Sequence, residues 1–417
     1  MNEFTSVFML FLFASLGVQL WLSLRQGRHV LAHRAEVPAA FAGRVSLVEH
    51  HKAADYSLAK GRLGRIELFW GTGLLLFWTL GGGLQWLDDL WRPLGWSAEW
   101  TSAAVFLSLL LIGMLLDLPF GLYRTFVLEA RFGFNRTSPR LWLVDRLKGL
   151  ALLLALGLPL LWLVLWLMGA AGSLWWLYVW GVWSGFSLLM IWAFPRFIAP
   201  LFNKFEPMAE GELRQRVEAL LQRCGFSSQG LFVMDGSRRS NHGNAYFTGF
   251  GKNKRIVFFD TLLKDLSADQ VEAVLAHELG HFHHQHIRIG LALSLSGSLI
   301  GLALLGLLMQ QPAFFSGLGV SQPSNHMGLL LFMLVGPVFS FFLSPLFAAL
   351  SRRHEFQADR YAAEQSRAQW LIEALVLLYR ENAATLTPDP LHSAFYDSHP
   401  PAPIRIAALQ RLDPAPV

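Results

Sequence analysis

The sequence predicts an α-helical integral membrane protein, and three observations support this fold class. Hydrophobic residues make up 53% of the chain and charged residues only 15%. The apolar residues gather in stretches of about 20 residues, the length of a helix that crosses a bilayer. A histidine-rich motif, 277–286, lies outside these stretches and indicates a metal site beside the membrane.

Seven stretches are long and apolar enough to span a bilayer. They lie at approximately 4–24, 66–87, 102–122, 149–169, 174–194, 287–309 and 327–350. The second is weakened by Glu67 and by three consecutive glycines, 81–83, and the third contains Asp117. Because an acidic residue at membrane depth usually faces a cavity or a partner, Asp117 is a candidate functional residue.

The distribution of Lys and Arg predicts the orientation. Basic residues concentrate in 25–65 and 124–148, whereas the connections on the opposite side carry almost none. By the positive-inside rule the N-terminus lies outside and the C-terminus in the cytoplasm. Anionic lipid headgroups account for the net charge of +5, so no nucleic-acid partner is predicted.

This topology divides the chain into four segments. Spans one to five with their basic loops occupy 1–194, and spans six and seven occupy 287–350. The intervening segment 195–286 and the C-terminal segment 351–417 both lie in the cytoplasm, and we expect them to form one unit. In the first of these two segments, the pattern predicts a helix at 210–223, strands at 231–234 and 255–259, an extended stretch at 244–250 and a helix capped by Ser267.

The capped helix carries an H-E-x-x-H motif. Residues four apart share a helix face, so His277 and His281 can bind one metal ion. Glu278 lies beside them, where a carboxylate can take a proton from water. The two histidines can bind one ion only if the motif lies on a helix, as the sequence predicts. The motif therefore predicts one Zn²⁺ per chain.

A catalytic zinc ion needs three protein ligands, and Glu355 is the best third candidate. Asp359 follows one helical turn later and could hold the back nitrogen of a ligand histidine. Spacing alone equally allows both carboxylates to be solvated charges that pair with neighbouring arginines. Further candidate ligands are His283, His284, His286 and His354.

Membrane di-iron hydroxylases and desaturases also use histidines at the cytoplasmic ends of their spans. Those enzymes need about eight histidines in three separate boxes. This chain has one such box, and the histidines of its first loop, His29, His33, His50 and His51, lack the spacing. The sequence therefore favours the zinc site.

Several stretches resemble a known family, the type I CAAX prenyl proteases, over nearly the whole chain. The resembling stretches, in order, are 118–127, 133–135, 198–205, 236–247, 252–257, the metal helix, 355–359, and 398–401 with Arg405 six residues beyond His399. So many motifs in a fixed order are not expected by chance.

The resemblance implies His277, His281 and Glu355 as zinc ligands and Glu278 as general base. It also implies that Asn244, His399 and Arg405 line the scissile bond. His399 could donate a hydrogen bond to the oxyanion, Asn244 could bind the substrate backbone, and Arg405 could hold Glu355 or a substrate carboxylate.

The family's fold implies seven transmembrane helices around a water-filled chamber, with a zincin-like catalytic unit that contains a small β-sheet on the cytoplasmic side. Short connections between spans six and seven and between Asp359 and His399 predict a bacterial member in the cytoplasmic (inner) membrane. The expected substrate is a peptide or protein, prenylated or membrane-associated. The alternatives are a quality-control protease for membrane proteins and a non-catalytic membrane scaffold, which the intact motif disfavours.

Overall fold

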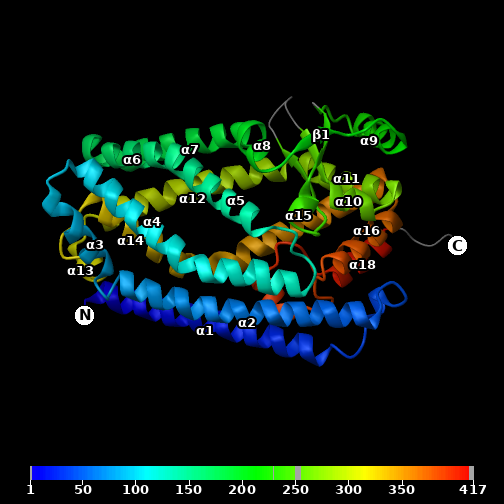
Figure 1. Ribbon diagram of the computed structural model, residues 1–417, viewed down its shortest axis with the longest axis horizontal. Helices are drawn as coiled ribbons and strands as arrows, with labels where there is room; N and C mark the ends of the chain where they lie inside the picture. Colours follow the sequence, from blue (N-terminus) through cyan, green and yellow to red (C-terminus); the bar gives the residue numbers. More distant parts are fainter. Residues whose placement is uncertain (1, 229, 249–254, 413–417) are drawn as a thin grey trace.

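The computed structural model describes residues 2–228, 230–248 and 255–412. Long helices run along the longest axis of the molecule, and a small sheet with its surrounding helices lies at one end (Figure 1). The first helix, α1 (Glu3–Ala32), begins at the opposite end and runs toward the sheet.

Within the described residues, six helical stretches are long and apolar enough to cross a membrane. Six of the seven predicted spans fall on them, so the chain is a multi-pass membrane protein. The stretches are Glu3–Ala32, Ala98–Glu129, Pro139–Ala170, Gly172–Phe202, His286–Leu308 and Asn325–Gln365. They contain α1, α4 (Ala98–Leu122), α5 (Pro139–Leu152), α6 (Leu158–Ala170), α7 (Trp175–Ala193), α8 (Ala199–Phe202), α12 (His286–Leu308), α14 (Asn325–Ser340) and α15 (Ser344–Gln365).

The bounds predicted for the second span, 66–87, are wrong. Helix α2 (Leu47–Trp78) ends inside this range, and α3 (Gly83–Trp91) begins after a tight turn. Gly82 takes a left-handed conformation with φ 75°, which side chains disfavour. A Cβ on Gly81 would lie 2.8 Å from the Phe77 carbonyl oxygen, so glycine is needed there as well. The apolar pattern therefore continues across a break in the helix.

A mixed, four-stranded sheet has the order β1-β2-β4-β3. Its strands are β1 (Phe205–Pro207), β2 (Leu231–Met234), β3 (Ala245–Thr248) and β4 (Arg255–Phe259). Strands β2 and β4 are parallel, and both outer pairs are antiparallel. The predicted strands at 231–234 and 255–259 are confirmed. The extended stretch forms β3, except that 249 and 250 lie outside the described residues. Strand β1 was not predicted.

One hydrophobic core joins the two segments predicted to be cytoplasmic. It contains buried side chains from 195–286, such as Val217, Phe258 and Val271, and from 351–417, such as Leu371 and Ile406. The contributing helices include α9 (Glu212–Arg223), α11 (Ala268–His283), α16 (Ala368–Glu381) and α18 (Ala402–Gln410). The remaining short helices are α10 (Asp260–Asp265), α13 (Pro312–Ser316) and α17 (Pro390–Tyr396). This shared core fixes α11 relative to the C-terminal helices.

Candidate metal centre

Helix α11 is built by its cap and by its apolar face. The Ser267 side chain accepts a hydrogen bond from the Gln270 backbone, and the Gln270 side chain accepts one from the Ser267 backbone. Val271, Leu275 and Leu279, each four residues apart, are buried in the core. The histidines of the motif occupy a different face, which turns toward α15.

Gly280 allows α11 and α15 to approach closely. A Cβ at this position would lie 2.8 Å from the Cα of Ala358, closer than any side chain tolerates. Ala358 lies on α15 between Glu355 and Asp359. The glycine inside the motif therefore brings both carboxylates against the motif histidines.

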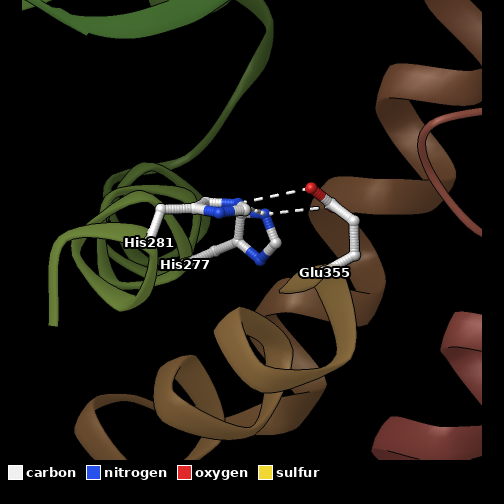
Figure 2. Close-up of side chains that lie close together, drawn as sticks. All are labelled: His277, His281 and Glu355. Atoms are coloured by element: carbon white, nitrogen blue, oxygen red, sulfur yellow. Dashed lines mark hydrogen bonds and ion pairs between the residues drawn. The ribbon is translucent and has the colours of Figure 1, made fainter. Parts of the chain in front are cut away.

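His277, His281 and Glu355 face one another across the gap between the two helices (Figure 2). The two Nε2 atoms are 3.3 Å apart. Nε2 of His277 lies 3.4 Å from Oε2 of Glu355, and Nε2 of His281 lies 3.3 Å from Oε1. Tetrahedral zinc with bonds of about 2.0–2.1 Å separates its ligand atoms by roughly 3.3–3.4 Å. The separation of the two nitrogens thus matches one edge of a zinc tetrahedron, and a Glu355 oxygen lies at edge distance from each nitrogen, Oε2 from His277 and Oε1 from His281.

The Glu355 carboxylate has an unused acceptor. The side chain is 4% exposed, and its buried Oε2 accepts no hydrogen bond within the part of the chain that the structure describes. His277 Nε2 and Arg405 Nη1 lie 3.4 Å from this oxygen, at ion-pair distance. A buried carboxylate oxygen without a hydrogen bond is costly. Two imidazoles and one carboxylate form the ligand set of zinc peptidases, so a zinc ion bound here supplies the missing partner.

Asp359 and Arg405 lie behind His277. Oδ1 of Asp359 is 2.9 Å from His277 Nδ1, which leaves Nε2 directed at Glu355. Arg405, buried at 6% exposure, donates through Nε to Asp359 at 2.8 Å, and its Nη1 lies 3.4 Å from Glu355 Oε2. Burial works to lower the pKa of His277, but hydrogen bonds with Asp359 and Glu355 raise it to about 9. The site therefore attracts positive charge.

His286 and Gln357 hold the second ligand histidine. Nδ1 of His281 lies 3.0 Å from Nδ1 of His286, and Nε2 of His286 lies 2.9 Å from Oε1 of Gln357. A carbonyl oxygen only accepts, so His286 carries its hydrogen on Nε2 and accepts through Nδ1. His281 then donates from Nδ1 and keeps the Nε2 lone pair for a metal ion. Sequence analysis gave Gln357 no role, although the residue lies within the resembling stretch 355–359.

The other predicted site residues lie at different distances from the ligands. Glu278 follows His277 on α11 and is half-buried. His399 is 62% exposed, and its Nε2 lies 3.5 Å from Glu355 Oε1. Asn244 is exposed at the start of β3, where its side chain accepts a hydrogen bond from the Ala245 backbone. Among the described residues, no hydrogen bond or ion pair joins Asn244 to the zinc ligands.

The remaining candidate ligands lie outside the cluster. The ring of His354 stacks on that of His286, with centroids 3.9 Å apart. His283 stacks on Tyr361 and His284 on His286, away from Glu355. Across the described ranges, the metal-type cluster comprises His277, His281 and Glu355 alone.

The site and the helices around it define a membrane-bound zinc metallopeptidase. Comparison with known proteins gives the family. Residues 26–204 match the family described as CAAX prenyl protease N-terminal, five membrane helices, and residues 207–413 match peptidase family M48. The chain therefore belongs to the CAAX prenyl protease 1 family of M48 peptidases.

Relatives support this assignment over nearly the full length. The CAAX prenyl protease 1 homolog of rice is 33% identical over 95% of this chain and 94% of its own length. The human homolog is 31% identical over 95% and 93%, and the yeast CAAX prenyl protease 1 is 37% identical over 72% and 69%. The crystal structure of S. mikatae Ste24p superposes with a TM-score of 0.91 at 31% identity, covering 98% of this chain and 99% of that one. These relatives are eukaryotic.

Proposed function

We propose that this chain hydrolyses a peptide bond near the C-terminus of prenylated proteins, at the cytoplasmic surface of a membrane. The observation that carries the proposal is the three-ligand zinc cluster at the end of a bundle of membrane-spanning helices. This position presents the zinc site to a chain end that a lipid holds in the bilayer. The relatives are named CAAX prenyl proteases, which supports the same substrate class.

Zinc bound at this site supplies a Lewis acid that polarises a peptide carbonyl and acidifies water. Glu278 is the general base. Burial raises the pKa of its carboxyl group, although His277 and His281 work to lower it, and the net shift is upward. A raised pKa suits a carboxylate that takes a proton from the attacking water and passes it to the leaving nitrogen.

The surrounding residues position the ligands and the substrate. The exposed His399 donates a hydrogen bond to the oxyanion of the scissile carbonyl. Asn244 directly precedes the edge strand β3, so its amide can bind a substrate backbone that pairs with this edge. Asp359 orients His277, and Arg405 holds Asp359 and Glu355, because its burial keeps it from a substrate carboxylate.

We infer that α2 completes seven spans around a water-filled chamber. A cavity of about 630 Å³ lies between α2, α4 and α5 and is lined by Glu67, Asp117 and Arg124. Arg124 forms an ion pair with Glu67. Charges at membrane depth require water or a partner, which this cavity provides.

The orientation follows from the basic segments. We propose an N-terminus outside, a cytoplasmic C-terminus and, from the short connections, a bacterial cytoplasmic membrane. The segments 1–194, 195–286, 287–350 and 351–417 form the corresponding parts of the chain. A reporter fused after Val417 should register the cytoplasm, and registration outside would refute the orientation.

Purified protein in vesicles tests the proposed substrate. A farnesylated peptide with a C-terminal CAAX sequence should be cleaved after the cysteine, and a zinc chelator should stop the reaction. The same peptide without the farnesyl group should be cleaved more slowly, because it is not held at the bilayer. Failure of the zinc-loaded protein to cleave the farnesylated peptide would refute the proposal.

A further inference from the structure

We propose that a basic groove beside the zinc site binds the free C-terminal carboxylate of the substrate, so that the enzyme measures the distance from the scissile bond to the chain end. This inference rests on the function proposed above. The groove has a volume of about 740 Å³. On one wall it carries Arg28 of α1 and Lys60, Arg62 and Arg65 of α2.

These cations have no anionic partner in the protein. Within the described residues, none of the four lies at ion-pair distance from a carboxylate; Arg65 donates to the Ser23 hydroxyl at 3.2 Å, and Lys60 lies over the Tyr56 ring. The groove wall contains a single carboxylate, that of Asp397. Four cations against one carboxylate leave an excess of positive charge that suits an anion.

Two other residues of the groove are close in sequence to predicted site residues. His242 and Asp397 line the groove. His399 is two residues beyond Asp397, and its Nε2 lies 3.5 Å from Glu355 Oε1. Asn244 is two residues beyond His242, on the way into β3. Because two residues of chain span at most about 7 Å, the connection from Asp397 to His399 keeps that end of the groove close to Glu355.

Length identifies the occupant. A tripeptide released from a CAAX sequence spans about 10 Å when extended. With the first peptide bond at the zinc site, this length carries the terminal carboxylate to the Asp397 end of the groove. Arg and Lys side chains bind carboxylates through charge-assisted hydrogen bonds. An amide at the same position offers no charge, so the groove should distinguish a free chain end from a blocked one.

Two peptides test this distinction. One is a farnesylated CAAX peptide with a free carboxylate, and the other is the same peptide with a C-terminal amide. Each is cleaved by the zinc-loaded protein in phosphatidylcholine vesicles, and kcat/KM is measured. We expect the free carboxylate to be preferred about tenfold, mainly through KM, since hydrogen bonds to charged groups typically have effects of this size. Equal kcat/KM for the two peptides would overturn the inference.

The double variant Arg28→Gln with Lys60→Gln assigns the preference to the groove. It should reduce the preference to about one, and an unchanged zinc content and thermal unfolding midpoint should show that the variant is folded. Arg44→Gln is the matched control, since Arg44 is an exposed cation that does not line the groove. A preference that survives in the double variant would overturn the inference.

A lipid headgroup is the competing occupant. Phosphatidylglycerol is added to the vesicles with the amide peptide as substrate. If this anionic lipid changes cleavage by the parent protein but not by the double variant, the groove binds headgroups and the inference is wrong. If neither peptide is cleaved by zinc-loaded protein, the proposed function itself fails. These two failures are therefore distinguishable.

Discussion

Two buried clusters at opposite ends of the molecule use the same three residue types. At the zinc end, His277 lies 2.9 Å from Asp359, which binds Arg405. At the other end, near α3 and α14, Nε2 of His326 lies 2.9 Å from Asp88, which binds Arg92. The ribbon places α3 and α11 far apart along the long axis (Figure 1). An Asp–His–Arg triplet is therefore not by itself the mark of an active site.

The difference lies in the second nitrogen of each histidine. Nδ1 of His326 lies 2.9 Å from the hydroxyl of Ser102, which in turn donates to the Ala98 carbonyl. Both nitrogens of His326 are thus used within the protein, and the triplet ties α3, α4 and α14 together. The second nitrogen of His277 instead faces His281 and Glu355. Because Nε2 of His277 meets Nε2 of His281 and the Glu355 carboxylate, the same triplet here forms part of a metal site.

The largest expected difference between the zinc end and the far end is in kcat, and the variant that shows it is Glu278→Gln. The ligands remain, so zinc content measured by elemental analysis should be unchanged. Loss of general-base catalysis should lower kcat by about 10²- to 10⁴-fold. Asp88→Asn, at the other end, should leave kcat within about twofold, since its side chain does not touch the zinc site. Near-normal turnover in Glu278→Gln would exclude it as the base.

Glu355→Ala should remove the metal itself. Two histidines alone bind zinc weakly, and the variant should lose most of its zinc and its activity together. His354→Ala is the matched control, because His354 is the preceding residue on α15 and lies outside the cluster. Retention of full zinc occupancy in Glu355→Ala would transfer the ligand role to another side chain.

A matched pair of conservative changes compares the triplets directly. Asp359→Asn should weaken zinc binding by about 10- to 100-fold, because the hydrogen bond that orients His277 is altered. Asp88→Asn removes the charge of a buried carboxylate that pairs with the partly exposed Arg92, and it should lower the free energy of unfolding without changing zinc affinity. Zinc titration and thermal unfolding measure the two quantities. Equal loss of zinc affinity in both variants would mean that the far cluster also governs the metal site.

Local patterns explain how much of the zinc site the sequence could predict. The motif spacing, the Ser267 cap and the apolar face place His277 and His281 on one helix without any tertiary information. Asp359 could be named from its position one helical turn after Glu355, although the same spacing allowed a solvated charge. Arg405 could be named only through family resemblance, since its contact with Asp359 joins positions 46 residues apart. Gln357 could not be found, because a glutamine on a helix has no distinctive spacing and its role depends on the contact with His286.

The fold shows the same limit. The spans that coincide with helices are those with long apolar runs that carry few charges, whose burial in lipid depends on composition alone. Helix α2 begins with a basic part that carries the groove residues and ends with an apolar part. The apolar pattern alone therefore predicted a span at 66–87, with the wrong start and end for this helix. Strand β1 has three residues, and its pairing with β2 requires a distant partner. Composition predicted the spans, whereas tertiary contacts decided their ends.

The smallest expected effect is on zinc affinity and comes from Gln357, which contacts His286 at the zinc end. If Gln357 fixes the hydrogen of His286 on Nε2, then Gln357→Leu releases His286 and loosens the orientation of His281. We expect zinc affinity to fall about tenfold or less, below the loss for Asp359→Asn, since His286 remains in place. His286→Ala should cost more than Gln357→Leu because it leaves His281 Nδ1 without an acceptor. Zinc titration of the two variants, with His284→Ala as the control on the adjacent ring, measures the order. Unchanged affinity in His286→Ala would show that α11 alone orients His281, and that the relay through α15 contributes nothing to the metal.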